Sequence, residues 1–258
     1  MRQKLFMKNR KITDERFIFD VKSDNAGTSN SNQMTIPTDI GTYLYDAETS
    51  DGQLITGNTG NLTISFPTAG TYTIFISGTF PKIFFNYVGD KDKIIEVKNW
   101  GLIVWKDLVS AFNGCFNLTN ISATDVPFDF TAPNISCFNA FRGCNLTNFS
   151  GIENWDMAGW GPNGVANLTT FLFQNPNLTT LNISGWDIST IKFANAFFSG
   201  KLDTANYDDI MTGWGAQTPI LNVKIDFGSS NYTIGGSGEA GRNILIDTYG
   251  WIINDGGG

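Results

Sequence analysis

The sequence predicts a mainly β protein with short helices, in which an N-terminal β-sandwich is followed by a short, capped solenoid. The strongest observation is one short Phe- and Leu-containing pattern that recurs in the middle of the chain. Its copies read FNGCFNL at 112–118, FRGCNL at 141–146, FQNPNL at 173–178 and, more faintly, FFSGKL at 197–202. The closing leucines are 28, 32 and 24 residues apart, within the range of periods of stacked repeats. Because so short a unit cannot bury its own apolar face, we expect the units to stack.

The second observation is a series of short alternating segments before the repeats, which predicts a sandwich over 15–88. Residues 16–22 (RFIFDVK) alternate between apolar and polar, and a second strand is expected at 42–46. LTISF (62–66) and YTIFI (72–76) flank a Pro-Thr-Ala-Gly turn, so the sequence predicts that they pair as a hairpin. Two further strand-like segments follow, IFFNY at 83–87 and KIIEVKNW at 93–100.

The solenoid itself is expected over 89–205. Its first part leads into the first coil and contains a candidate short helix at 105–112 (WKDLVSAF). The third copy of the pattern has Pro176 where the first two copies have Cys. The side chains expected to face the core are Leu118, Ile121, Leu146, Phe149, Leu178, Leu181 and Ile183, with Phe171, Phe173, Phe197 and Phe198 covering the other side of each coil.

Residues 206–258 break the repeat, and we interpret them as a closing unit, because a solenoid must cover its exposed end. NYDDIMTGWG (206–215) predicts a short helix with Asn206 as its N-cap. The remaining expected elements are a strand at 223–227 and, within 238–255, a helix, a stop at Gly250 and a final strand.

The composition narrows the class of protein. Charged residues make up 16% of the chain and the net charge is −7, whereas a typical globular domain has about 25% charged residues. Asn, Thr, Ser and Gly must therefore cover much of the surface, which suits β-rich extracellular or virion proteins. The sequence has no basic stripe, so we expect no nucleic-acid partner. It also has no run of 18 apolar residues, so we expect no membrane insertion.

Catalytic and metal-binding patterns are weak. The chain has no histidine, which excludes Ser-His-Asp and Cys-His catalysis. Two acid pairs could be proposed as glycosidase carboxylates and one acidic loop as a calcium site. Exposed or capping acids and a plain turn are the simpler interpretations, so we expect no enzymatic activity, no cofactor and no metal. The acids concerned are Asp125 with Asp129, Asp208 with Asp209, and Asp46 with Glu48 and Asp51.

The three cysteines are Cys115, Cys137 and Cys144. Cys115 and Cys144 hold the same place in consecutive copies of the pattern, so we expect them in adjacent coils. An odd count at repeat positions predicts buried thiols rather than a disulfide framework. Oxidation of the stacked pair is the alternative, if the geometry allows it.

Two sets of motifs resemble known families. The F-x-G-C-x-N-L-T pattern, followed by Trp155-Asp156 or Trp186-Asp187, resembles the BspA-like leucine-rich-repeat surface proteins. The stretch from Asn206 to Asp255 is similar to the closing unit of that group. The residues that carry this second likeness are Tyr207, Asp208, Trp214, Arg242, Asn243, Leu245, Ile246, Gly250, Trp251, Ile253, Asp255 and Gly256.

The N-terminal part, with FPTAGTYTIFISGTFP at 66–81, is similar to the PKD-like sandwich that precedes such repeats in marine bacterial and phage sequences. The usual W-G-D-G turn is replaced by DAETSDG at 46–52, so that strand is expected to be rebuilt. The two resemblances imply an immunoglobulin- or PKD-like sandwich followed by a leucine-rich-repeat-like solenoid. They also imply a role in surface adhesion or interaction.

Aromatic residues outside the repeat register are the candidate binding residues. Trp160 lies in the insert AGWGPNG at 158–164, and Tyr43, Tyr45 and Trp100 lie near the sandwich or its junction with the repeats. Loop aromatics stack on sugars or anchor protein interfaces; the alternative is that they pack on the next coil. The arm at 1–14 is a candidate docking peptide through its basic residues Arg2, Lys4, Lys8, Arg10 and Lys11.

The function these features predict is non-enzymatic recognition or assembly at a surface. The first hypothesis is a phage virion component, such as a fibre, decoration or receptor-binding protein, that contacts a host glycan, a host protein or neighbouring virion subunits. The amino terminus has no apolar run typical of a secretory signal, which favours this hypothesis. The second is a bacterial cell-surface adhesin, and the third, from another class, is a carbohydrate-active enzyme. A homo-oligomer is compatible with the first two.

Overall fold

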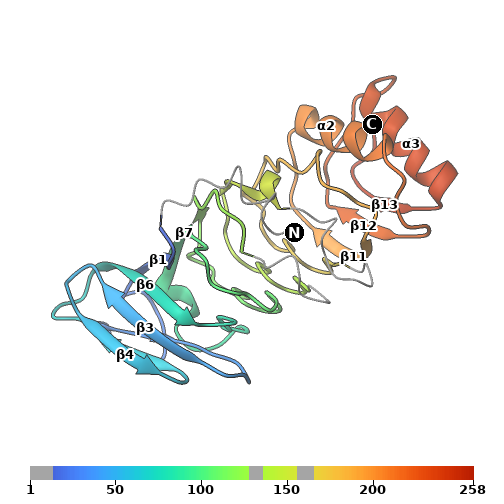
Figure 1. Ribbon diagram of the computed structural model, residues 1–258. Coiled ribbons are helices and arrows are strands. Elements are labelled where there is room, and N and C mark those ends of the chain that lie inside the picture. Colours follow the sequence, from blue (N-terminus) through green and yellow to red (C-terminus); the bar gives the residue numbers. More distant parts are fainter. Residues whose placement is uncertain (1–13, 128–135, 156–165) are drawn as a thin grey trace.

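The computed structural model describes residues 14–127, 136–155 and 166–258, and the protein is mainly β, as the sequence predicts. Figure 1 shows an elongated molecule. The N-terminal strands lie at one end, a series of stacked coils forms the middle, and two helices lie at the other end. Within the described residues, neither helix has the length and apolarity needed to cross a membrane.

The N-terminal part contains two sheets that share one hydrophobic core. The larger has seven strands in the order β4-β3-β6-β1-β7-β8-β9, and the smaller pairs β2 with β5. Phe19 and Ile76 of the larger sheet and Met34 and Ile64 of the smaller are fully buried in the same cluster. The strands of this part are β1 (Phe17–Lys22), β2 (Gln33–Ile36), β3 (Leu44–Thr49), β4 (Leu54–Asn58), β5 (Leu62–Ser65), β6 (Thr71–Thr79) and β7 (Ile94–Asn99).

The predicted hairpin between 62–66 and 72–76 is wrong. Strand β5 pairs with β2, whereas β6 pairs with β1 and β3, so the turn between them carries the chain from one sheet to the other. Both segments alternate in the way the sequence suggested, but alternation does not name the partner strand. Stacking of Phe66 on Tyr72, with ring centroids 3.9 Å apart, closes the turn.

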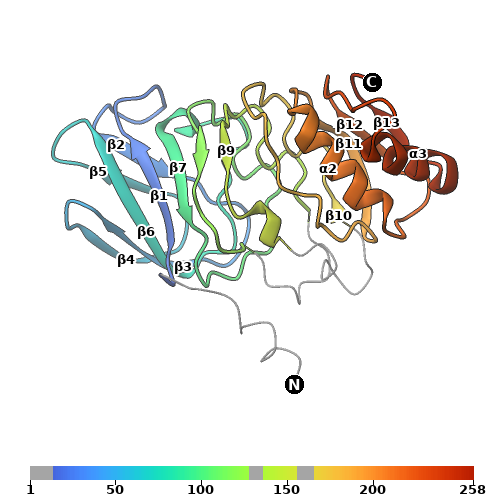
Figure 2. The ribbon, with the colours of Figure 1, turned by 90° about the horizontal axis from the view of Figure 1, so that it is seen from above.

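Strand β7 joins the N-terminal sheet to the coils. It pairs antiparallel with β1 on one side and parallel with β8 (Asn120–Ile121) on the other, and β8 pairs parallel with β9 (Asn148–Phe149). The sheet therefore continues across the predicted boundary at 88/89 without a break (Figure 2). A third sheet is parallel throughout and contains β10 (Ala166–Asn167), β11 (Ile191–Phe198), β12 (Lys224–Phe227) and β13 (Ile252–Asn254).

A second line of hydrogen bonds joins successive coils. The Gly114 N–H donates to Arg142 O over 2.7 Å, the Gly143 N–H donates to Phe173 O over 2.9 Å, and the Leu172 N–H donates to Phe197 O over 2.9 Å. The predicted helix at 105–112 is wrong for this reason, because the Leu108, Ser110 and Phe112 N–H groups all donate to the next coil. The segment 83–87 is likewise not a strand. Its Phe85 and Tyr87 N–H groups donate to carbonyls of the first coil and begin the same series of hydrogen bonds.

The register of this line corrects one position in the repeat. Gly114, Gly143 and Gln174 are equivalent, and all three have positive φ (78°, 66° and 62°). The residue after Gln174 is Asn175, so Asn175 and not Pro176 occupies the place of Cys115 and Cys144. The contacts agree, because Cys144 Sγ donates to Phe112 O of the preceding coil and Asn175 Nδ2 donates to Phe141 O over 2.8 Å. The sequence pattern aligned Pro176 with the cysteines because the left-handed position of the third copy carries Gln instead of the Gly that marks it in the first two copies.

The apolar repeat positions are buried as predicted, with the exception of Phe173, which is half-buried. Tryptophans add a periodic polar contact to this core. The indole N–H groups of Trp186, Trp214 and Trp251 donate to carbonyls 31–34 residues earlier in the chain, over 2.7–2.8 Å. Each of these tryptophans therefore fastens its own coil to the preceding one.

The closing unit contains helices α2 (Thr204–Gly215) and α3 (Ser237–Tyr249). Both are predicted, and α3 ends at Gly250 in the left-handed conformation (φ 68°), as expected. Helix α2 begins earlier than predicted, with Asp203 as N-cap. Asn206 instead uses its side chain to hydrogen-bond the Leu181 N–H and carbonyl of a neighbouring coil, over 2.8 and 3.2 Å.

Candidate functional site

Three of the four candidate binding aromatics are buried, which corrects the expectation that they are exposed. Tyr43, Tyr45 and Trp100 expose 4%, 1% and 0% of their surface. The hydroxyl group of Tyr45 donates to Gly60 O over 2.8 Å, and the Trp100 ring stacks on Phe17. These side chains therefore stabilise the core. The fourth candidate, Trp160, lies outside the described residues, as do residues 1–13 of the basic arm predicted at 1–14.

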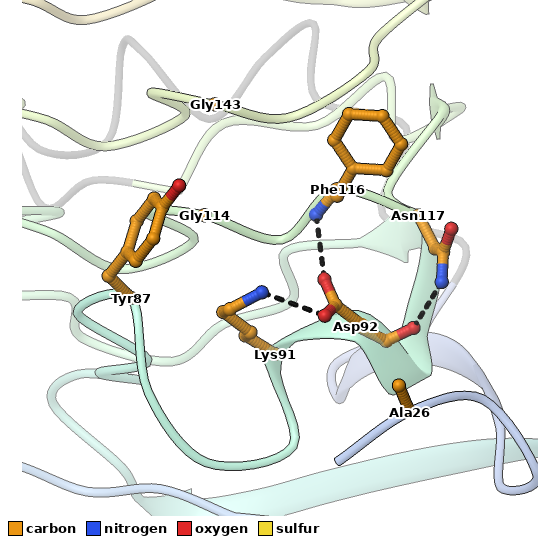
Figure 3. A pocket seen from close by; sticks show the side chains of 8 residues that line it. All are labelled: Ala26, Tyr87, Lys91, Asp92, Gly114, Phe116, Asn117 and Gly143. Carbon is orange, nitrogen blue, oxygen red and sulfur yellow. Dashed lines mark hydrogen bonds and ion pairs between the residues drawn. The ribbon is translucent and has the colours of Figure 1, made fainter.

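The aromatic side chains that are exposed together lie elsewhere, at the junction of the N-terminal sheets and the first coils. Tyr87 and Phe116 expose 59% and 61% of their surface. They flank a recess of about 410 Å³. In Figure 3 the two rings stand on either side of Lys91 and Asp92. The complete lining is Ala26, Tyr87, Lys91, Asp92, Gly114, Phe116, Asn117 and Gly143.

Two irregularities of the repeat build this recess. Tyr87 occupies the left-handed position (φ 69°) that Gly114 and Gly143 occupy in the next two coils. A Cβ atom on Gly114 would lie 2.4 Å from the Tyr87 ring, so the ring rests where the glycine leaves space. Phe116 is the extra residue of the first copy, FNGCFNL, relative to the second, FRGCNL. The first coil therefore carries an exposed ring that the second coil lacks.

The polar side of the recess is a connected set of groups. Lys91 Nζ lies 2.7 Å from Asp92 Oδ2 and 5.4 Å from the centre of the Tyr87 ring. Asp92 Oδ1 accepts the Phe116 N–H over 3.3 Å. The Asn117 side chain donates to the Asp92 carbonyl over 2.8 Å. A cation, a carboxylate and an amide thus lie beside the two exposed rings.

A buried clamp holds this polar side in place. Lys91 and Asp92 belong to the 3-10 helix η2 (Lys91–Lys93), and Lys93 is fully buried. The Lys93 ammonium donates to the carbonyls of Asn30 and Gln33, over 2.8 Å each. Because the Lys93 ammonium is buried and bonded to backbone carbonyls, it holds the η2 segment that carries Lys91 and Asp92 in place.

Asp90, the residue before η2, completes the clamp. Its carboxylate accepts the Thr28, Ser29 and Thr35 N–H groups over 2.7–2.9 Å. Burial alone would raise the pKa of the Asp90 carboxyl, but the hydrogen bonds from Ser29 and Thr35 and the nearby Lys93 ammonium hold that pKa below its ordinary value. Burial lowers the pKa of the Lys93 ammonium.

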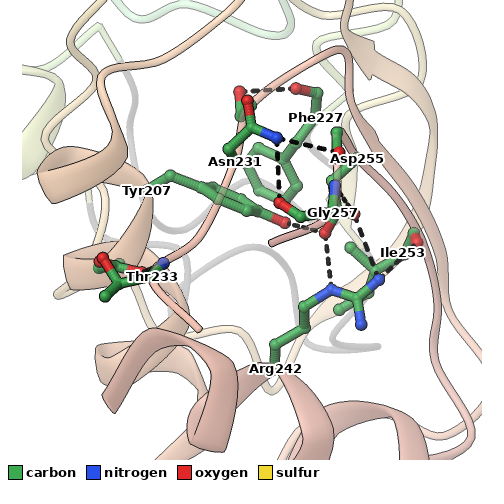
Figure 4. Close-up of polar contacts among 11 residues, drawn as sticks. Tyr207, Phe227, Asn231, Thr233, Arg242, Ile253, Asp255 and Gly257 are labelled. Atoms are coloured by element: carbon green, nitrogen blue, oxygen red, sulfur yellow. Dashed lines mark hydrogen bonds and ion pairs between the residues drawn. The ribbon is translucent and has the colours of Figure 1, made fainter. Parts of the chain in front are cut away.

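The second polar cluster lies in the closing unit and is structural (Figure 4). The Asp255 carboxylate accepts from the Tyr207 hydroxyl group over 2.7 Å and from Arg242 Nε over 2.6 Å. The Asp255 side chain exposes 3% of its surface. Burial alone would lower the pKa of the Arg242 guanidinium, but Asp255 raises it above the ordinary value. The cluster ties helices α2 and α3 to the end of the chain.

Five of the acids that could have suggested catalysis or calcium binding have partners of their own, and Asp209 is exposed on α2. Asp125 accepts the Trp100 and Gly101 N–H groups, and Asp208 accepts the Thr233 N–H and hydroxyl groups. Asp129 lies outside the described residues. Asp46, Glu48 and Asp51 each have their own partner, Gly57, Arg16 and Gln53 respectively. Within the described ranges, the acids and cysteines form no group of three or more that could hold a metal ion.

The cysteines are free and buried, as predicted. Burial raises the pKa of all three thiols, and for Cys115 the neighbouring Cys144 raises it further. A thiol held in this state is a poor nucleophile, since the thiolate is the reactive species. These residues therefore belong to the core.

The chain was compared with protein-family models, with curated proteins and with solved structures, and none of them matches it.

Proposed function

We propose that this protein is a non-enzymatic recognition or structural component of a biological surface, and that the recess between Tyr87 and Phe116 is its recognition site. The observation that carries the proposal is the pair of exposed rings beside a connected set of polar groups. Exposed aromatics on a rigid scaffold are typical of binding sites. Asp125 and Asp208, two of the acids considered for catalysis, accept hydrogen bonds from backbone N–H groups, which favours binding over chemistry.

The architecture we propose is a PKD-like sandwich followed by a leucine-rich-repeat-like solenoid with a closing unit. Two observations support it. The two N-terminal sheets share a core, and parallel strand partners recur at intervals of 24–31 residues, as in Glu96 with Asn120 and Ala194 with Ile225. A stacked body of this kind presents a long surface and suits recognition.

The place we propose is the surface of a phage virion, where neighbouring virion proteins or further copies of this chain would be the structural partners. The basic arm with Arg2, Lys4, Lys8, Arg10 and Lys11 is the proposed docking segment. A bacterial cell-surface adhesin is the alternative, and the same recess would serve it. A carbohydrate-active enzyme is the least favoured candidate.

The test of the virion proposal is incorporation into particles. Particles from the native producer are purified by density gradient and probed with an antibody to this protein. The virion proposal expects a signal that co-migrates with the capsid protein, and loss of that signal on deletion of residues 1–14. Equal incorporation of the truncated protein contradicts the role of the arm, and signal in the cell envelope alone favours the adhesin.

A further inference from the structure

The recess combines two chemistries that only some ligands satisfy together. Tyr87 and Phe116 offer exposed aromatic faces, whereas Lys91, Asp92 and Asn117 offer hydrogen-bonding groups beside them (Figure 3). A purely apolar ligand would displace water from these groups without replacing its hydrogen bonds, which is costly. A purely polar ligand would gain nothing from the rings. The occupant therefore has apolar faces and a polar edge.

The charge of the recess selects against ionic ligands. The Lys91 ammonium lies 2.7 Å from the Asp92 carboxylate, so the pair is close to neutral. The chain as a whole carries a net charge of −7, which opposes phosphate-rich partners. Each group keeps capacity for a further hydrogen bond, because an ammonium has three donors and a carboxylate about four acceptor positions. The occupant is thus uncharged and rich in hydroxyl groups.

The size of the recess selects against a large partner. Its volume of about 410 Å³ lies near the lower end of the range of small-molecule sites, about 300–1,000 Å³. A stable protein partner needs about 800 Å² of surface on each side, far more than two rings and three polar groups supply. A short portion of a chain-like ligand fits this space better than a folded domain does.

We propose that the recess binds an uncharged pyranose unit of a surface glycan. Tyr87 and Phe116 stack on the C–H faces of the sugar, and Lys91, Asp92 and Asn117 hydrogen-bond its hydroxyl groups. This inference rests on the recognition role proposed above and names the class of ligand for that same site. The clamp of Asp90 and Lys93 keeps the polar groups in position before the sugar arrives.

The direct test is a titration of the full chain with neutral sugars. The probes are the methyl glycosides of glucose, galactose, mannose and N-acetylglucosamine and a glycan array, and the readout is the amide shifts of Gly114, Phe116 and Asn117. We expect at least one neutral sugar to shift these amides. Tyr87→Gly, which copies the residue of the next coil, and Phe116→Ala should each weaken that binding about tenfold. The absence of any shift with every probe, together with an array without signal, overturns the inference.

Control variants separate the loss of a ring from the loss of the fold. Phe193→Ala removes a ring that is 44% exposed on β11, outside the recess, and should bind the sugar as the wild type does. Tyr87→Phe keeps the stacking face and should stay within about twofold of the wild type. All variants should melt within about 3 °C of the wild type. If Phe193→Ala weakens binding as much as Phe116→Ala does, the recess is not the sugar site.

A third measurement separates failure of this inference from failure of the recognition role. Retention of labelled protein is measured on cells of the producing bacterium, or of the phage's host, after periodate oxidation of vicinal diols or after protease digestion. Loss after periodate supports the glycan. Retention that survives periodate but is lost after protease treatment contradicts a glycan ligand, while it remains consistent with the proposed recognition role. No retention on untreated cells, together with no signal in particles or envelopes, contradicts the recognition role itself.

Discussion

Replacing Asn175 with alanine should destabilise the protein strongly, because this side chain is a buried connector between coils. Asn175 is fully buried. Its Oδ1 atom accepts the Leu146 N–H over 3.1 Å, and its Nδ2 atom donates to Phe141 O and Leu172 O over 2.8 and 3.1 Å. One side chain thus bonds backbone groups of both its own coil and the preceding one.

The size of the effect follows from these three contacts. Each net hydrogen bond is worth about 1 kcal/mol, and a buried donor left without a partner costs about 1–3 kcal/mol. In Asn175→Ala the Leu146 N–H is that donor. We therefore expect the free energy of unfolding to fall by about 3 kcal/mol. Asn175→Cys should lower the free energy of unfolding by about half as much. The introduced thiol can donate to the preceding coil as the equivalent Cys144 thiol donates to Phe112 O, but sulfur is a weak acceptor for the Leu146 N–H.

The assay is urea denaturation followed by tryptophan fluorescence, with Asn177→Ala as the matched control. Asn177 is exposed and makes one side-chain bond, to Asn145 over 2.6 Å, so its replacement should cost no more than about 0.5 kcal/mol. The transition slopes must agree between variants for the midpoints to be compared. If Asn175→Ala unfolds at the same midpoint as Asn177→Ala, the coil register given above is wrong.

Three further predictions concern other parts of the core. The pKa of Asp90 is lower in the folded protein than in the unfolded chain, so the unfolded state binds more protons as the pH falls through about 4, and the free energy of unfolding declines there. The free energy of unfolding of Asp90→Asn should be lower at pH 7 and should decline less with falling pH. Parallel curves of this free energy against pH for the two proteins would refute the prediction. Asp255→Asn should lower the free energy of unfolding by about 2–4 kcal/mol, because Arg242 loses its buried partner. Asp247→Asn, at an exposed position, should leave it unchanged, and equal urea midpoints for the two variants would contradict the prediction. A thiol reagent such as DTNB should label no cysteine in the native protein and three after denaturation, and rapid native labelling would show that burial does not protect Cys115, Cys137 and Cys144.

Local signals in the sequence predicted individual elements well. Alternation predicted β1, and the segment before Gly250 predicted α3 together with its end at that glycine. The pairing of β5 with β2 was not predictable, because the choice of partner depends on which sheet can bury Ile64. The segment 105–112 looked helical by composition, but its N–H groups are used by the next coil.

The recess was missed for a related reason. Phe116 was visible in the sequence as an inserted residue of the first copy, and an insertion in a repeat is where an exposed side chain is expected. Tyr87 was hidden because its segment alternates like a strand. Its backbone adopts φ 69° only because it takes the αL position of the coil. Tyr45, by contrast, shares the inward face of β3 with Ala47, and Tyr43, directly before β3, continues the same alternation. Period-two alternation alone therefore places both in the core.

The most direct test of the proposed recognition site compares the wild type with the double variant Tyr87→Gly/Phe116→Ala. Labelled proteins are incubated with cells of the producing bacterium, or of the phage's host, and the retained fraction is measured beside Phe193→Ala. We predict that the wild type and Phe193→Ala are retained equally. We also predict that the double variant, although folded, is retained at least about tenfold less. Equal retention of all three proteins would contradict the claim that the Tyr87–Phe116 recess is the recognition site.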